Sequence, residues 1–165
     1  MRILGIDPGF AIVGIGVIDY IGNKFIPVKY GKIETTAGLP LADRLKTIHV
    51  MLNTWILETK PDVVAIEELF FNTNTKTAIA VAQARGVIML TCTLNNLEVF
   101  EYTPLQVKQA VVGYGRAEKI QVQKMVKSLL NLESIPKPDD VADALAVSVC
   151  HANNSGFNNA LSKFK

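Results

Sequence analysis

The sequence is short of the residues that most often mark thiolate, disulfide or histidine chemistry. Only two cysteines and two histidines occur among its 165 residues. Cys92 and Cys150 each lie within an apolar helical pattern, with no C-x-x-C motif and no histidine at ligand spacing, so we expect ordinary buried thiols. His49 and His151 fall on separate predicted helices, where we expect structural or solvent-facing roles. A zinc or redox centre is therefore not predicted.

Long hydrophobic runs are also missing, although 49% of the residues are hydrophobic. The apolar stretches are short and interrupted by charge, and none approaches the roughly 18 residues of a membrane span. Asp7 breaks the first apolar run before a signal-peptide core could form. We therefore expect a cytoplasmic protein with a single domain over residues 1–152 and a frayed, Asn- and Ser-rich tail over residues 153–165.

The apolar periodicity alternates between strand-like and helix-like segments. Strands are predicted over residues 3–6, 12–20, 25–35, 63–66 and 98–102. Helices are predicted over residues 40–59, 75–95, 104–112, 119–131 and 139–152. The first three strands are too closely spaced for a crossover, so they predict an antiparallel meander, and the later strands extend the sheet in parallel. The fold class is therefore α/β, with a five-stranded mixed sheet flanked by helices.

Positive charge is concentrated in one stretch, although the net charge is only +2. Residues 104–137 contain Glu118 and Glu133 as their only acids. Their basic residues are Lys108, Arg116, Lys119, Lys124, Lys127 and Lys137. Such a cluster indicates either a nucleic-acid contact or only a solvated helix face, and the charge pattern alone does not decide between them.

Two carboxylates follow buried strands directly. Asp7 comes at the end of the first strand before a Pro-Gly turn, and taken alone it is better explained as a residue that caps the turn. Glu67 follows the apolar run of residues 63–66, where a charged residue seldom stands without a partner. Glu67 and Glu68 together could also mark no more than the point at which the strand leaves the core.

A second pair of carboxylates lies on one face of the last predicted helix, since Asp140 and Asp143 are three residues apart. Asp139 and Asp140 could simply favour the helix N-terminus, but that interpretation does not explain Asp143. The small residues Ala142, Ala144 and Ala146 would let this helix pack close to the sheet. If the four acids converge, their oxygen ligands favour Mg²⁺ or Mn²⁺, and two such ions suit phosphodiester hydrolysis.

Along nearly its whole length the chain resembles a known family, the RuvC family of bacterial nucleases with an RNase H-like fold. The stretches that carry the resemblance are Gly5-Ile6-Asp7-Pro8-Gly9, Ala65-Ile66-Glu67, Gln83-Ala84-Arg85-Gly86, Phe100-Glu101-Tyr102, Gln106-Val107-Lys108-Gln109, Val111-Val112-Gly113, Ala117-Glu118-Lys119 and Ala142-Asp143-Ala144-Leu145-Ala146. The first motif alone is weak, because actin-like kinases and chaperones also open with a Gly-Ile-Asp turn. The motifs together, in the family's order, predict the family.

The resemblance implies a catalytic, metal-binding tetrad of Asp7, Glu67, Asp140 and Asp143. It leaves Glu68 and Asp139 outside the tetrad and implies that Glu68 points away from it.

The resemblance also implies DNA contacts. Phe70, with Phe71 beside it, matches the aromatic that stacks on a base near the junction. Lys108 and Lys119 match lysines that approach the scissile phosphate, and Arg116 lies in the same basic stretch.

The implied activity is resolution of four-way DNA (Holliday) junctions. A homodimer would make paired nicks that leave a 5′-phosphate and a 3′-hydroxyl, using two Mg²⁺ ions per site with Mn²⁺ as a substitute. We expect the helix over residues 75–93 to form part of the dimer contact, because small residues line it, and RuvA- and RuvB-type branch-migration proteins are implied partners.

Three other functions compete with this one. An actin-like ATPase or sugar kinase would need a second phosphate loop and a duplicated domain, for which 165 residues leave no room. An RNase H-like nuclease that processes ribosomal RNA precursors would lack the Gln-Val-Lys-Gln and Ala-Glu-Lys stretches. A catalytically silent junction-binding protein would have no need of all four acids.

Overall fold

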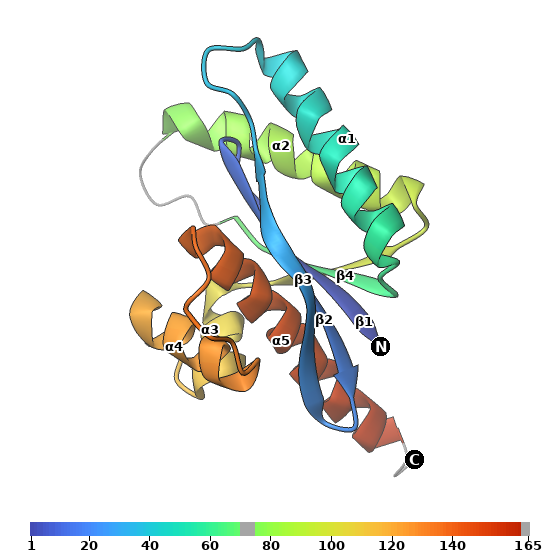
Figure 1. Ribbon diagram of the computed structural model, residues 1–165, viewed down its shortest axis with the longest axis vertical. Helices are drawn as coiled ribbons and strands as arrows, with labels where there is room; N and C mark the ends of the chain where they lie inside the picture. The colour runs from blue at the N-terminus through green and yellow to red at the C-terminus, as the bar shows by residue number, and fades with distance from the viewer. Residues whose placement is uncertain (70–74, 163–165) are drawn as a thin grey trace.

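A computed structural model describes residues 1–69 and 75–162 of the chain (Figure 1). The strands are β1 (Arg2–Asp7), β2 (Ile12–Ile21), β3 (Lys24–Glu34), β4 (Val63–Glu67) and β5 (Glu98–Tyr102). The helices are α1 (Leu41–Thr59), α2 (Thr75–Leu94), α3 (Pro104–Val112), α4 (Lys119–Leu129) and α5 (Asp139–Ser162). Among the described helices, none has both the length and the apolar content needed to cross a bilayer.

The five strands form one mixed sheet in the order β3-β2-β1-β4-β5. β1, β2 and β3 pair as the predicted antiparallel meander. β4 joins β1 in parallel, and β5 joins β4 in parallel. The predicted five-stranded mixed sheet is therefore confirmed. Its central strands β1 and β4 both deliver their carboxyl ends to the same edge.

Helices cover both faces of the sheet, as Figure 1 shows, with α1 and α2 on one face and α5, α3 and α4 on the other. Each face has its own apolar core. Ile6, Ile48 and Ile88 are completely buried on the α1–α2 side. Ile3, Val126 and Leu145 are completely buried on the α5 side. Alternate residues of β1 therefore anchor both layers.

Local sequence determines where the helices over residues 104–129 begin. Thr103 caps α3 in a reciprocal capping box with Gln106, and Pro104 follows as the first helical residue, as predicted. Gly113 ends α3 in the left-handed conformation. Glu118 and Gln121 form a second capping box at the start of α4. The basic stretch is thereby divided into two short, well-capped helices.

The last helix is longer than predicted. The residue pattern predicts a helix that ends at residue 152, but the backbone of α5 stays helical to Ser162. No proline interrupts this segment, and the side chains of Asn153 and Asn154 donate hydrogen bonds to the backbone oxygens of Ala110 and Cys150. These hydrogen bonds satisfy the polar side chains of Asn153 and Asn154 while their backbone remains helical. Residues 163–165 lie outside the described part of the chain.

Glycines on the sheet let α5 approach the strands closely. An ideal Cβ added to Gly5 would lie 2.1 Å from the backbone oxygen of Ala144, and one added to Gly14 would lie 1.9 Å from that of Asp140. Only a residue without a side chain can occupy either position unless the helix moves. The predicted close packing of the alanine-rich helix is confirmed, and the sheet contributes to it as much as the helix does.

Candidate active site

Asp7 and Glu67 end two adjacent parallel strands. The register pairs Ile6 of β1 with Ile66 of β4, so the next residue on each strand reaches the same edge of the sheet. The apolar residues before each carboxylate are fully buried. Both side chains therefore emerge from the core at neighbouring points.

Asp140 and Asp143 reach the same edge from α5. Asp7 pairs with Gly14 across β1 and β2, and the Asp140 backbone lies directly against Gly14. The first turn of α5 is consequently held over the end of β1. Asp143, one turn further along the helix, lines a cavity together with Glu67.

The four carboxylates interact electrostatically. Burial raises the pKa of Asp7 well above its ordinary value, and the negative charges of Glu67, Asp143 and Asp140 add to this effect. Burial and the nearby Asp143 likewise raise the pKa of Glu67 to about 7. Burial also raises the pKa of Asp143. The fold thus gathers negative charge that needs a cationic partner.

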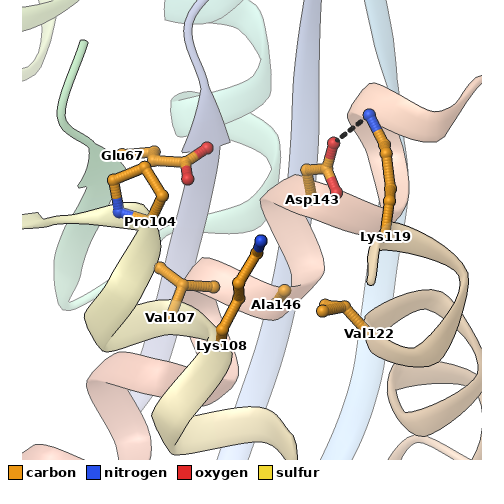
Figure 2. Close-up of a pocket in the computed structure, with 8 residues that line it drawn as sticks. All are labelled: Glu67, Pro104, Val107, Lys108, Lys119, Val122, Asp143 and Ala146. Atoms are coloured by element: carbon orange, nitrogen blue, oxygen red, sulfur yellow. Dashed lines mark ion pairs between the residues drawn. The ribbon is translucent and has the colours of Figure 1, made fainter. Parts of the chain in front are cut away.

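Two lysines border the cavity between Glu67 and Asp143, which has a volume of about 180 Å³. Figure 2 shows Lys108 reaching up from α3 between the two carboxylates, and Lys119 standing beside Asp143. The Lys119 ammonium lies 2.8 Å from Asp143 Oδ2 and 2.6 Å from Asp139 Oδ2. Pro104, Val107, Val122 and Ala146 complete the cavity wall. The cavity is therefore lined by two acids, two bases and apolar side chains.

The chemistry of these side chains suits a hard divalent cation. Four carboxylates supply oxygen ligands, and burial, followed by the neighbouring carboxylates, raises the pKa of Asp7. Within residues 1–69 and 75–162, however, no three His, Cys, Asp or Glu side chains are already arranged around one metal position. Asp143 directs one carboxylate oxygen to Lys119. The residue types fit Mg²⁺ or Mn²⁺, whereas the side-chain arrangement is not that of a closed metal site.

Glu67 and Glu68 serve different surroundings, as the resemblance implied. Glu68 lines a separate cavity with Arg85 and Glu101, which form an ion pair between α2 and β5. The Glu68 backbone N–H donates to the oxygen of Tyr102, which continues the pairing of β4 with β5. Of the two adjacent glutamates, only Glu67 lines the cavity that it shares with Asp143.

The remaining predicted site residues have different outcomes. Arg116 is exposed in the connection between α3 and α4. Phe70 and Phe71 lie outside the described residues, so their predicted stacking role stays a prediction.

The residues for which no site chemistry was predicted are structural. Cys92 and Cys150 are buried free thiols, as expected. His151 is buried and shares a hydrogen bond of 2.8 Å with the hydroxyl of Tyr102, and His49 bonds to Thr91.

Two contributions to the site were not predicted from the sequence. The first is the pair of glycines, Gly5 on β1 and Gly14 on β2, that allow α5 to approach the sheet. Only their positions inside otherwise apolar strands could have indicated this close approach. Asp139 was expected to act only as a helix N-terminal residue, yet its carboxylate holds Lys119. Nothing in the spacing of Asp139 and Lys119 along the chain indicates this contact.

Comparison with known proteins identifies the family. A family model described as crossover junction endodeoxyribonuclease RuvC matches residues 3–151. The chain belongs to the RuvC family. A RuvC protein of Alkaliphilus metalliredigens, named crossover junction endodeoxyribonuclease RuvC, is 62% identical over 157 residues, covering 95% of this chain and 96% of the relative. The corresponding Clostridioides difficile protein is 56% identical over 161 residues, covering 98% and 95%.

Solved structures of RuvC proteins share the fold. Thermus thermophilus RuvC in complex with a Holliday junction substrate matches with a TM-score of 0.91 and 33% identity, covering 96% of each chain. The yeast mitochondrial Holliday junction resolvase Ydc2 has a TM-score of 0.70 at 14% identity, which shows the common fold alone. The RNase H-like fold predicted for this RuvC-family chain is thus confirmed.

Proposed function

We propose that this chain is a Holliday junction resolvase, a DNA endonuclease that cuts four-way junctions by paired symmetric nicks. The observation that carries the proposal is the convergence of Asp7, Glu67, Asp140 and Asp143 beside a lysine-lined cavity in a RuvC-family chain. Its relative from Thermus thermophilus was solved in complex with a Holliday junction substrate. The high identity to proteins named as crossover junction endodeoxyribonucleases supports the same activity here.

Asp7, Glu67, Asp140 and Asp143 would hold two Mg²⁺ ions, with Mn²⁺ as a substitute. When bound, such ions lower the pKa of an attacking water and stabilise the charge on the leaving oxygen. The protein's own contribution is to preorganise the ligands, because two strand ends and one helix turn fix their backbones. Burial of Asp7 and Glu67 keeps these ligands poorly hydrated, so less water has to be displaced when a cation binds.

The lysines would position the scissile phosphate. Lys108 and Lys119 border the cavity from α3 and α4, so a phosphate between Glu67 and Asp143 would meet positive charge from both helices. Water would attack phosphorus and the bond to the 3′ oxygen would break. The products are a 5′-phosphate and a 3′-hydroxyl, which a ligase can seal. Arg116 would contact the backbone further from the cut, and Phe70 and Phe71 would stack on junction bases.

Paired nicks require two sites, and we propose a homodimer formed through α2. Its outer face exposes Ile79, Leu90 and Leu94 at 68%, 57% and 64%. Gly86 lies on the same exposed face, and no part of the described chain outside its own helix backbone comes within 4 Å of an added Cβ. A glycine inside a helix costs roughly 1 kcal/mol relative to alanine, and no contact with the described residues offsets that cost. Close approach of a second α2 would explain both features. Of the predicted small residues, Ala84 instead faces the core.

RuvA- and RuvB-type branch-migration proteins are proposed partners on the basis of family membership alone. The described surface offers no feature that identifies their contact.

Cleavage of a synthetic four-way junction, beside a linear duplex of the same sequence, tests the proposed function. We expect symmetric, ligatable nicks on the junction only, in Mg²⁺ or Mn²⁺ but not in EDTA. Asp7→Asn should abolish cleavage while junction binding persists, and it should stabilise the fold because it removes a desolvated charge from among three others. Asp43→Asn, at an exposed acid in the first turn of α1, is the matched control and should cut normally.

Several results would contradict the proposal. Preferential cutting of structured RNA would indicate ribosomal RNA processing, and junction binding without cutting in any metal would indicate a silent binding protein. Loss of junction binding in Asp7→Asn would show that Asp7 is structural.

A further inference from the structure

Lys119 occupies an electrostatically unfavourable place in its own helix. It is the first residue of α4, where the positive end of the helix dipole opposes a cation. Burial also works against its protonated form, but its hydrogen bonds to Asp139 and Asp143 outweigh burial and raise the pKa of Lys119. Carboxylates from α5 therefore stabilise a charge that α4 alone would disfavour.

The two carboxylates that hold Lys119 differ in their role at the site. Asp143 is a proposed metal ligand with 22% of its side chain exposed, whereas Asp139 lies outside the tetrad and is 49% exposed. Lys119 itself is 55% exposed, so a DNA phosphate can reach its ammonium from solvent. The hydrogen bond to Lys119 lowers the pKa of Asp139, as expected for a tight ion pair.

We propose that Lys119 is the built-in counter-ion of the carboxylate cluster, competing with divalent cations for Asp143 until a substrate phosphate draws its ammonium away. Asp139, which is not a proposed metal ligand, holds the lysine beside the site through a second ion pair. The proposal rests on the metal-dependent function proposed above. It adds that DNA binding and metal binding reinforce each other through one side chain.

The physical basis is competition for charge. A protonated lysine 2.8 Å from Asp143 already neutralises part of the negative potential that would attract a divalent cation, and it repels that cation. Phosphate offers the ammonium an alternative anion and so frees the potential of Asp143 for the metal. By linkage, whatever factor DNA contributes to metal affinity, metal contributes to DNA affinity.

Calorimetric titration of Mn²⁺ into the DNA-free protein tests the proposal. Lys119→Met should bind Mn²⁺ about tenfold more tightly than the unmodified chain, within the roughly 5- to 150-fold range usual for coupled sites. Lys124→Met is the matched control, because it removes the same charge from the exposed side of α4, away from the cavity. This control should change the affinity by no more than about threefold.

A second measurement follows the effect of DNA on Mn²⁺ affinity within each protein. Adding a short linear duplex should tighten Mn²⁺ binding to the unmodified chain and have a much smaller effect in Lys119→Met. Equal Mn²⁺ affinity in Lys119→Met and Lys124→Met, or an equal effect of DNA in both, would overturn the counter-ion role while leaving metal-dependent cleavage intact. Absence of Mn²⁺ binding in every protein would overturn the metal-dependent function and the counter-ion role together. Unfolding midpoints establish that each variant is folded.

Discussion

Replacing Gly14 with alanine should push α5 away from the sheet and so disable the carboxylate cluster. The added Cβ would lie 1.9 Å from the backbone oxygen of Asp140, and ordinary contact begins only at 3.4 Å. The two elements would therefore have to separate by roughly 1.5 Å. Neither side can give way locally, because β2 is paired on both edges and the opposing atom belongs to a helix backbone.

The expected effects can be estimated from known cases of overpacking. Forcing extra volume into a packed core costs about 1 to 3 kcal/mol of folding free energy. Moving reacting groups by about 1 Å can lower a rate roughly a hundredfold. We expect both effects in Gly14→Ala, because the backbone that must move belongs to Asp140, and Asp143 follows one turn later on the same helix.

Urea unfolding followed by the fluorescence of Trp55, the single tryptophan, measures the first effect. Single-turnover cleavage of a four-way junction, at a temperature where the variant is fully folded, measures the second. Ser128→Ala, at an exposed position of α4, is the control for stability; because alanine favours the helix more than serine does, it should gain at most about 0.7 kcal/mol. A Gly14→Ala protein with an unchanged unfolding midpoint and cleavage rate would refute the close packing of α5 on β2.

Three further predictions concern pH, assembly and substrate contact. His151 is buried, and desolvation lowers its pKa in the folded protein. The folded protein should therefore lose stability as pH falls below about 6.5, where the histidine of the unfolded chain takes up a proton. Urea unfolding at several pH values should show a smaller loss in His151→Gln. Gly86→Arg should convert the proposed dimer to a folded monomer in sedimentation, whereas Ser128→Arg on the exposed side of α4 should not; a Gly86→Arg dimer would rule out α2 as the contact. Lys108→Ala should slow junction cleavage more than it weakens binding and should reduce the salt dependence of binding, and an unchanged cleavage rate would remove Lys108 from the phosphate site.

Much of the sheet could be predicted from local pattern. The alternation of short apolar strands with amphipathic helices located all five strands, and the short links between β1, β2 and β3 left only an antiparallel arrangement. Helix starts with strong capping signals, such as Thr103 and Pro104, were also predictable. The end of α5 was not, because Asn and Ser favour turns in isolation, whereas the neighbouring backbone of Ala110 offers Asn153 a partner.

The amino-acid sequence by itself determined which carboxylates are candidates, because a charge directly after a buried strand, or a pair of charges on one helix face, is seldom found without a partner. Local pattern is enough to identify Asp7, Glu67, Asp140 and Asp143 as such residues. Only the tertiary structure decided how they meet: glycines on β1 and β2 let the α5 backbone touch the strands. It also decided that Asp139 shares Lys119 with Asp143, a contact between helices that begin 20 residues apart. The local sequence pattern identifies which residues are charged. The distance from the Asp143 carboxylate to the Lys119 ammonium, however, depends on how the helices pack against the sheet.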